Sequence, residues 1–389
     1  MSGAPNAATV TAFDLEHYAH IIDARSEGEY AEDFIPGAVN HPVLSNDQRA
    51  RVGRLNKVAS AFEAKRMGAA LVSRNIADML EQHFADKPRD WAPLVYCWRG
   101  GKRSRSLTLV LREIGFKAEQ LDGGYKAYRA RVANELTELP KRFQYVTICG
   151  CTGTGKTALL LALRDAGAQV IDLEGLANHK GSLLGENLLP AAMVQKASFA
   201  GTPPPSPQPP ASAGAGSTPL GGGGISPQPT QKRFDSLLWS TLRSLDPARP
   251  VFVESESKKI GLVQMPESMR EQMAAGECVW LDVPVAARVA HLRGEYDHFV
   301  NDPALLMHKL APLKALRGGE MLSRWQALAG AGNIDGIVES LLIDHYDPLY
   351  ITAIRRNYPK LATARQVTIN ALTPSALRDA ATALASSPL

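Results

Sequence analysis

The sequence has few cysteines, no long apolar run and little net charge. Four cysteines among 389 residues are too few for a disulfide framework, which indicates a reducing compartment and predicts a cytoplasmic protein. No uncharged apolar run reaches about 18 residues, so no membrane-spanning helix is expected. The N-terminus, Met1–Pro5, lacks the basic segment and apolar run of a signal peptide. The net charge of +4 permits an anionic partner without demanding one.

Length and pattern divide the chain into two α/β domains. A chain of 389 residues is long enough for two or three domains. Residues 1–138 alternate short apolar strands with helical patterns, which indicates a mostly parallel sheet. A second domain, residues 139–389, opens on a strand at Phe143–Cys149. Residues 200–227 within it are rich in proline and glycine, which predicts a flexible insertion; an interaction motif there is the less favoured alternative.

A cysteine follows one of the apolar strands of the first domain. Leu94–Tyr96 ends in Cys97, and an apolar helical pattern resumes at Leu107. A loop at a helix N-terminus turns backbone N–H groups inward, where they bind anions and favour a reactive thiolate. A buried structural cysteine is the alternative, but the glycines and basic residues of the loop argue against it. The expected anion-binding residues are Arg99, Gly100, Gly101, Lys102 and Arg103.

The strand that opens the second domain runs into a phosphate-binding motif. Residues 150–157 fit the P-loop pattern G-x-x-x-x-G-K-[ST] without a mismatch, and a helix is expected from Ala158 to Ala166. Backbone N–H groups would cradle a diphosphate, Lys156 would neutralise its charge and Thr157 would reach a Mg²⁺ ion. A chance glycine-rich turn is the alternative. The motif consists of Gly150, Cys151, Thr152, Gly153, Thr154, Gly155, Lys156 and Thr157.

Acidic residues at strand ends of the second domain are candidate metal ligands. Glu254 and Glu256 end a strand that begins near Val251, and Asp172 ends another. For Glu254 and Glu256, a helix cap or a lone ion pair is nearly as well supported. Cys149 and Cys151 form a C-x-C pair, but nothing supplies further ligands, so structural zinc is not expected. Haem and flavin are not expected either.

The C-terminal part of the second domain is mainly helical. Helical patterns cover residues 303–331 and 334–344, followed by a strand at 367–371 and a helix at 374–385. This predicts a nucleoside-kinase-like P-loop core with a helical appendage.

Five stretches of the first domain resemble, in order, the signatures of a rhodanese-like domain. The resemblance implies a domain that carries sulfur or a heavier chalcogen on Cys97. The loop from Cys97 to Arg103 has seven residues, as in rhodanese-fold phosphatases, whereas sulfurtransferases usually have six. The wider loop favours a phosphate-bearing or heavier-chalcogen donor. The five stretches are Ile22–Arg25, Glu29–Tyr30, Ile35–Ala38, the Cys97 loop and Leu121–Tyr125.

The fusion of these two domains resembles the tRNA 2-selenouridine synthase family. The resemblance also rests on residues 172–182, 228–234, 254–261 and 345–350. It implies an α/β chain with an N-terminal rhodanese-like domain and a C-terminal P-loop NTPase-like parallel-sheet domain. It implies an enzyme that replaces the sulfur of wobble 2-thiouridine by selenium, with selenophosphate as donor and geranyl diphosphate as prenyl donor. Its partners would be the tRNA anticodon loop and, as a candidate, selenophosphate synthetase.

The resemblance suggests a mechanism of two stages. In the first, the P-loop holds the diphosphate while the thiouridine sulfur attacks the allylic carbon. In the second, Cys97 either attacks the selenium of selenophosphate, giving a perselenide, or assists addition at C2 of the base; the sequence leaves both open. Arg99, Lys102 and Arg103 would hold the phosphate portion. Trp98 would stack on the flipped base, or pack against the domain interface.

Basic residues along the second domain are candidate tRNA phosphate contacts, although solvated surface is the more frequent role of such pairs. His179 is expected to touch the base or a phosphate, or to satisfy a loop hydrogen bond. The basic candidates are Lys141, Arg142, Lys180, Lys232, Arg233, Lys258, Lys259, Arg355 and Arg356.

Three other functions fit parts of the pattern. One is a sulfurtransferase fused to an ATPase that drives sulfur delivery, and another is a phosphatase dependent on Cys97. The third is a regulatory tRNA- or nucleotide-binding module with an inert rhodanese domain. The presence of Cys97, Lys156 and Thr157 argues against an inert module.

Overall fold

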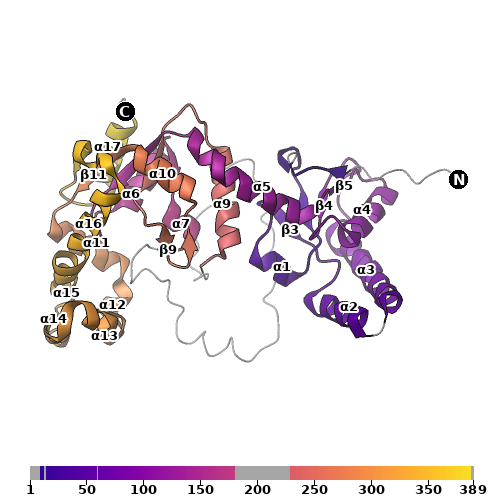
Figure 1. The fold of residues 1–389 in the computed structure, drawn as a ribbon, viewed down its shortest axis with the longest axis horizontal. Coiled ribbons are helices and arrows are strands. Elements are labelled where there is room, and N and C mark those ends of the chain that lie inside the picture. Colours follow the sequence, from indigo (N-terminus) through magenta and orange to yellow (C-terminus); the bar gives the residue numbers. More distant parts are fainter. Residues whose placement is uncertain (1–8, 13–14, 59, 180–227, 387–389) are drawn as a thin grey trace.

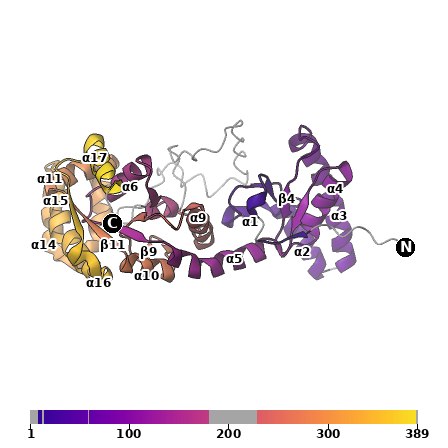
Figure 2. The same ribbon diagram turned by 90° about the horizontal axis from the view of Figure 1, so that it is seen from above.

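The computed structural model describes residues 9–12, 15–58, 60–179 and 228–386. Figures 1 and 2 show two α/β domains side by side, with the helix α5 (Gly124–Glu138) running from the N-terminal domain to the C-terminal one. None of the helices in these ranges is long and apolar enough to cross a membrane. The predicted α/β class and the two kinds of domain are confirmed. The predicted insertion at 200–227 lies outside the described residues.

The N-terminal domain is built on a five-stranded parallel sheet in the order β1-β5-β4-β2-β3. The central strand β4 (Leu94–Tyr96) is buried throughout, as expected for a parallel strand covered on both faces. The other strands are β1 (Thr9–Val10), β2 (Ile21–Asp23), β3 (Ala38–Asn40) and β5 (Glu119–Leu121). The helices before α5 are η1 (Leu15–His17), α1 (Glu27–Glu32), α2 (Asn46–Val58), α3 (Ala61–His83) and α4 (Lys102–Ile114).

Strand β1, η1 and helix α2 were not predicted, although the other strands and helices of this domain were; the longest of the three is α2. None of its residues is buried, so it has no apolar stripe to reveal it in the sequence. It is stabilised by packing against the longer helix α3. Helix α5 extends to Glu138, and its residues Val132 and Leu136 are buried in the core.

The C-terminal domain has a second five-stranded parallel sheet, in the order β12-β11-β6-β8-β7. Side chains of β6 (Tyr145–Cys149) alternate between two cores: Val146 and Ile148 face the helices α6 and α17, whereas Tyr145 and Cys149 join the core beneath α9 and α10. The other strands are β7 (Gln169–Ile171), β8 (Val251–Glu254), β11 (Glu277–Asp282) and β12 (Arg365–Thr368). The surrounding elements are η2 (Leu139–Arg142), α6 (Lys156–Asp165), α7 (Leu173–Ala177), α9 (Gln231–Ser244), the hairpin β9 (Lys259–Ile260) and β10 (Val263–Gln264), α10 (Glu267–Ala275) and α17 (Pro374–Ala385).

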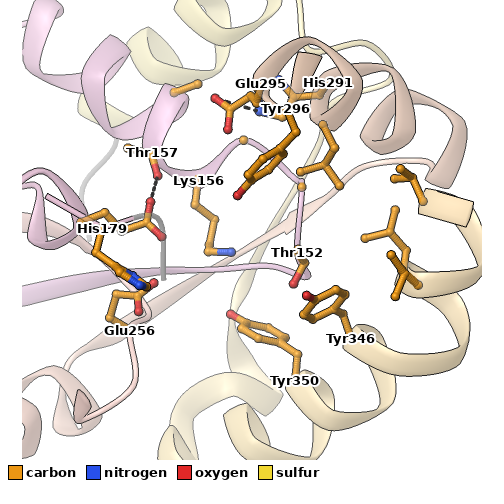
Figure 3. Close-up of a pocket in the computed structure, with 18 of the residues that line it drawn as sticks. Thr152, Lys156, Thr157, His179, Glu256, His291, Glu295, Tyr296, Tyr346 and Tyr350 are labelled. Atoms are coloured by element: carbon orange, nitrogen blue, oxygen red, sulfur yellow. Dashed lines mark hydrogen bonds and ion pairs between the residues drawn. The ribbon is translucent and has the colours of Figure 1, made fainter. Parts of the chain in front are cut away.

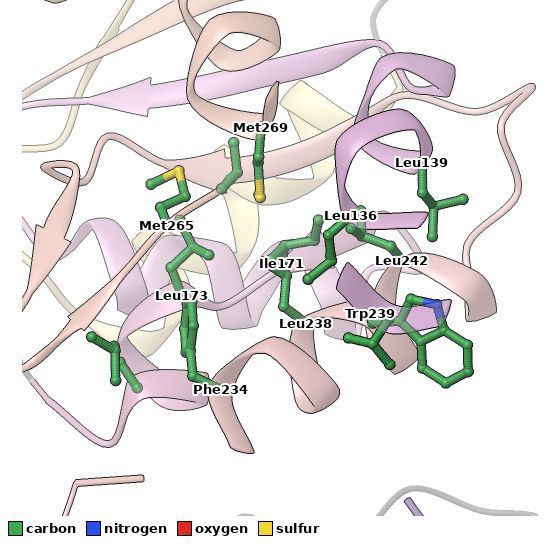
Figure 4. Packing of buried hydrophobic residues seen from close by; sticks show 14 of the residues in the cluster. Leu136, Leu139, Ile171, Leu173, Phe234, Leu238, Trp239, Leu242, Met265 and Met269 are labelled. Carbon is green, nitrogen blue, oxygen red and sulfur yellow. The ribbon is translucent and has the colours of Figure 1, made fainter. Parts of the chain in front are cut away.

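One apolar core continues from the first domain into the second. Figure 4 shows Leu136 of α5 packed beside Leu238 and Leu242 of α9, with Ile171 of β7 next to them. Polar contacts add to this interface, because the hydroxyl of Ser236 donates to Asp33 at 2.9 Å. Helix α9 therefore attaches the C-terminal domain to the turn that follows α1.

The helical appendage follows β11 and has a separate core around the buried indole of Trp325. Its helices confirm the predicted helical segments at 303–331 and 334–344, and β12 and α17 confirm the last strand and helix. Its elements are α11 (Val285–Glu295), α12 (Asp297–Asn301), α13 (Pro303–Leu310), η3 (Ala311–Leu313), α14 (Lys314–Gly330), α15 (Ile334–Ser340), η4 (Leu341–Tyr346), α16 (Asp347–Asn357) and η5 (Pro359–Thr363).

Candidate active sites

Cys97 lies directly after β4, at the carboxyl edge of the first sheet. Its Sγ accepts hydrogen bonds from the backbone N–H of Gly101 at 3.2 Å and from the hydroxyl of Ser104 at 3.1 Å. Ser104 in turn accepts from the side-chain amide of Gln120 at 2.9 Å. The sulfur is therefore held in place by two donors of its own loop and helix. The side chain is almost fully buried, so a reagent must reach it through the loop.

The Cys97 loop is joined to the start of helix α5. The carbonyl oxygen of Cys97 accepts from the N–H of Tyr125 at 2.8 Å, and that of Trp98 accepts from Lys126 at 3.0 Å. This close approach needs glycine at position 124, where φ is +54° and a Cβ atom would lie 2.2 Å from the Cys97 oxygen. The helix that reaches the second domain therefore also fixes the loop of the candidate nucleophile.

The basic residues of the loop have different surroundings. Arg103 forms an ion pair with Glu29, with 2.6 Å between Nη1 and Oε2, so its guanidinium is engaged by a carboxylate. Arg99 and Lys102 are exposed and form no ion pair within the part of the chain that the structure describes. These two side chains are the better placed to meet a phosphate. Trp98 is half-buried and its ring lies 5.4 Å from that of Tyr125, as the packing alternative predicted.

The Glu29–Arg103 pair gives the loop a measurable pH dependence. Burial would raise the pKa of Glu29, but the hydrogen bonds and charge of Arg103 outweigh it and lower the pKa to about 2. Because the folded pKa is below the unfolded one, the pair stabilises the protein above pH ~4.5, and the contribution is lost as the pH falls toward 2. Glu29→Gln should cost about 3 kcal/mol of unfolding free energy at pH 7 and much less at pH 3, as measured by urea unfolding. An equal loss at both pH values would contradict this account.

The P-loop connects β6 to α6 in the predicted strand-loop-helix arrangement. Gly153 and Gly155 adopt φ values of +79° and +74°, which few other residues tolerate. The ammonium of Lys156 lies inside the loop and donates to the carbonyl oxygen of Gly150 at 2.9 Å. A bound phosphate would compete for this ammonium. The loop thus has the backbone form and the cation that a diphosphate requires.

Carboxylates gather around the hydroxyl of Thr157. Its Oγ1 lies 3.0 Å from Glu174 Oε2 and 2.9 Å from Glu254 Oε2, and the N–H of Glu174 donates to Glu254 Oε1 at 3.0 Å. Oxygens of Glu174, Glu254 and Glu256 all lie within 4.8 Å of one another. Burial and the neighbouring acids raise the pKa of Glu254, and the same causes raise that of Glu256 to about 7. Oxygen donors crowded in this way fit a hard divalent cation such as Mg²⁺.

Two of the three predicted acids belong to this cluster, and one does not. Asp172 instead caps helix α7, since its carboxylate accepts from the N–H of Gly175 at 2.7 Å. This cap role was not predicted for Asp172, which the sequence suggested only as a candidate metal ligand. Glu174, which sequence reasoning missed, takes its place in the cluster. Its position in the first turn of a helix that follows a parallel strand was the only available signal.

A pocket of about 490 Å³ extends from the P-loop into the helical appendage. Figure 3 shows Thr157 and Glu256 to the left of Lys156 and Tyr346 to its right, with Tyr296 above Lys156 and Tyr350 below it. The polar end holds the phosphate loop and the acids, whereas the far end is apolar. The apolar lining comprises Leu292, Tyr296, Phe299, Val300, Leu306, Ile334, Val338, Leu341, Leu342 and Tyr346.

The candidate tRNA contacts are spread over several environments. Lys232 pairs with Glu32 at 2.6 Å, and Arg233 donates to the carbonyl oxygen of Phe34 at 3.1 Å, so both lie in the interdomain contact. His179 lines the pocket. Lys180 lies outside the described residues. The other candidates are exposed, with Lys141 paired to Glu138 and Lys258 to Glu267; they are Lys141, Arg142, Lys258, Lys259, Arg355 and Arg356.

Each of the two candidate sites lies in a part of the chain that matches a known domain profile. The profile of a rhodanese-like domain matches residues 12–131, and that of the tRNA 2-selenouridine synthase AAA domain matches residues 143–199 and 215–309. A tRNA 2-selenouridine synthase of Marinobacter nauticus is 28% identical, over 85% of this chain and 87% of the relative. This chain is similar to tRNA 2-selenouridine synthases in both of its domains.

Other members of the tRNA 2-selenouridine synthase family match a smaller share of their own length. The proteins of Nitrosomonas europaea and Nitrosomonas eutropha are 30% and 31% identical over 71% of this chain, and the match covers 63% and 62% of those relatives. The chain thus spans less than two thirds of these two proteins. The break in the domain profile, at residues 200–214, falls within the predicted proline- and glycine-rich insertion.

Proposed function

We propose that this chain replaces the sulfur of wobble 2-thiouridine in tRNA by selenium, through an S-geranylated intermediate. Geranyl diphosphate would supply the prenyl group and selenophosphate the selenium. The observation that supports this most is the pocket that joins a P-loop to an apolar cavity. A prenyl diphosphate has the same two parts, a diphosphate head and an apolar tail.

The first stage would take place at the P-loop. Lys156 and the loop N–H groups hold the diphosphate, and the tail lies among the apolar side chains of the appendage. The sulfur of 2-thiouridine attacks the allylic carbon, the carbon–oxygen bond breaks, and the electron pair leaves on the diphosphate. The base loses its N3 proton to the surroundings. Because the charge of the leaving group grows in this step, a fixed cation next to it lowers the barrier.

A Mg²⁺ ion would fit beside Thr157, held by its hydroxyl and by Glu174, Glu254 and Glu256. Bound there, it would supply further positive charge against the diphosphate. The acids themselves orient Thr157. The backbone N–H of Glu174 also donates to the Glu254 carboxylate, which fixes helix α7 against β8.

The second stage would take place at the Cys97 loop. Arg99 and Lys102 are exposed beside the thiol and would hold the phosphate of selenophosphate. Selenium replaces the geranylated sulfur at C2, and geranyl thiol is released. The two donors on Cys97 Sγ keep the thiolate available for this stage.

Exposed basic residues would bind the tRNA backbone, so affinity should fall steeply with salt. Lys259, exposed on β9, lies two positions after the pocket residue Ser257. Lys259→Ala should weaken tRNA binding and reduce the slope of log K against log salt by about 1. Lys65→Ala, in the exposed face of α3, is the matched control and should leave the slope unchanged. Filter binding at several salt concentrations measures both. A flat salt dependence would contradict the assignment of these contacts.

The experiment that tests the proposed function omits each co-substrate in turn. The protein is incubated with thiolated tRNA, geranyl diphosphate and selenophosphate, and the nucleosides are identified by mass spectrometry. We expect 2-selenouridine only with all three, and S-geranyl-2-thiouridine when selenophosphate is omitted. ATP turnover with persulfide loading from thiosulfate would indicate the sulfurtransferase–ATPase, and Cys97-dependent release of phosphate from aryl phosphates the phosphatase. Binding of tRNA without any product would indicate the regulatory module.

A further inference from the structure

One segment of the appendage, helix α16, supports the P-loop at two positions, Gly150 and Thr152. Helix α16 begins at Asp347 and contains Tyr350, and these two side chains reach different points of the loop. The hydroxyl of Tyr350 accepts from the N–H of Gly150 at 3.2 Å. Asp347 acts through Arg288 of α11, which donates from Nε to the carbonyl oxygen of Thr152 at 2.9 Å.

The Arg288–Asp347 pair is built as a rigid support. Its two nitrogens lie 2.8 and 2.6 Å from the two carboxylate oxygens, which is bidentate geometry. The Arg288 side chain is buried, so its charge is screened little by solvent. A buried guanidinium with three hydrogen bonds in one plane has almost no rotational freedom. It therefore fixes the Thr152 carbonyl relative to α16.

Tyr350 is similarly constrained. Its hydroxyl also contacts Ser255 Oγ at 2.6 Å, and its ring centroid lies 5.2 Å from the ammonium of Lys156. The side chain thus touches the P-loop backbone, the strand end that carries the acids, and the P-loop cation. Figure 3 shows it below Lys156, on the opposite side of the pocket from Tyr296.

The same helix also lines the apolar part of the pocket, through Ala353 and Ile354. We propose that Asp347, Arg288 and Tyr350 are positioning residues that hold the P-loop in its phosphate-binding form. Phosphate affinity is then set by the appendage, and any movement of α16 caused by an occupant of the apolar end is passed to the loop. The inference rests on the phosphate-binding part of the proposed function and extends it to residues that act on the P-loop backbone.

The test measures the affinity of the full chain for inorganic pyrophosphate by calorimetry, together with the melting temperature without ligand. Tyr350→Phe removes one hydroxyl, and Asp347→Asn removes the charge that orients Arg288. We expect each to weaken pyrophosphate binding about tenfold, while the melting temperature of Tyr350→Phe stays within a few degrees of the parent. Thr352→Ala is the matched control, because Thr352 lies exposed on the same helix and its hydroxyl only bonds the carbonyl oxygen of Pro348.

The outcomes separate this inference from the proposed function. If the parent chain binds pyrophosphate and Tyr350→Phe binds it within twofold of the parent, the positioning role is wrong, whatever happens to geranyl transfer. If Tyr350→Phe weakens pyrophosphate binding but the parent transfers no geranyl group, the positioning role holds and the prenyl donor is wrong. If the parent binds no pyrophosphate, both fail.

Discussion

Lys156→Ala should lower the rate of geranyl transfer to thiolated tRNA by about 10²–10³-fold. Lys156 is the one P-loop residue with a positively charged side chain, so its ammonium attracts the negative diphosphate. The ammonium already lies within the loop, 2.9 Å from the Gly150 carbonyl oxygen. Its removal leaves the charge of the leaving group stabilised by the backbone N–H groups and by any Mg²⁺ bound beside Thr157, without the fixed ammonium. Release of S-geranylated nucleoside, measured by mass spectrometry in a single turnover, gives the rate.

The control for this variant is Lys65→Ala, which removes an exposed ammonium from the first domain and should leave the rate unchanged. Thr157→Ala is expected to fall between the two, since it removes a hydroxyl between two carboxylates but no charge. Geranyl transfer by Lys156→Ala at the parent rate would exclude the P-loop as the site of the first stage.

Cys97→Ser should retain geranyl transfer and lose selenium incorporation by at least about 10²-fold. A serine hydroxyl is a much weaker nucleophile than a thiolate and would be held by the same Gly101 and Ser104 donors. The S-geranylated nucleoside should therefore accumulate, which nucleoside analysis detects directly. Cys278→Ser, in β11 and outside both sites, is the control thiol variant. Parent-like selenation by Cys97→Ser would exclude a covalent role for Cys97.

The phosphorus product distinguishes the two routes open to Cys97. If the thiolate attacks selenium, a sulfur–selenium bond forms and the selenium–phosphorus bond breaks with its electron pair on phosphorus, so phosphite is released. Transfer of that selenium to C2 then also requires a thiol reductant, which takes the Cys97 sulfur into a disulfide and leaves the electron pair on selenium. If Cys97 instead adds at C2 of the base, water cleaves the selenium–phosphorus bond at phosphorus and phosphate is released. Phosphorus-31 NMR of the completed reaction separates phosphite from phosphate.

Local patterns sufficed for the two loops. Cys97 and Lys156 each lie between an apolar strand and a helix, and backbone hydrogen bonding within about fifteen residues determines such a unit. The same reasoning placed most strands and helices. It missed α2, because a helix without buried residues leaves no periodic pattern.

Features that are assembled from distant segments of the chain could not be predicted from the sequence. Glu174 and Glu254 are 80 positions apart, and Arg288 meets Asp347 across 59 positions. Lys232 and Arg233 looked like RNA contacts in the sequence, yet their partners Glu32 and Phe34 lie about 200 residues earlier. Only the packing of α9 on the first domain brings them together. The apolar pocket likewise needs side chains from five separate helices of the appendage and the P-loop beside them.

The division of the reaction between two sites is tested most directly by supplying the intermediate. Lys156→Ala and Cys97→Ser are each given tRNA that already carries S-geranyl-2-thiouridine, together with selenophosphate. We predict that Lys156→Ala forms 2-selenouridine at the parent rate, because only the first stage needs the P-loop, and that Cys97→Ser forms none. Failure of Lys156→Ala on this substrate, or parent-like selenation by Cys97→Ser, would contradict the assignment of the two stages to the two sites.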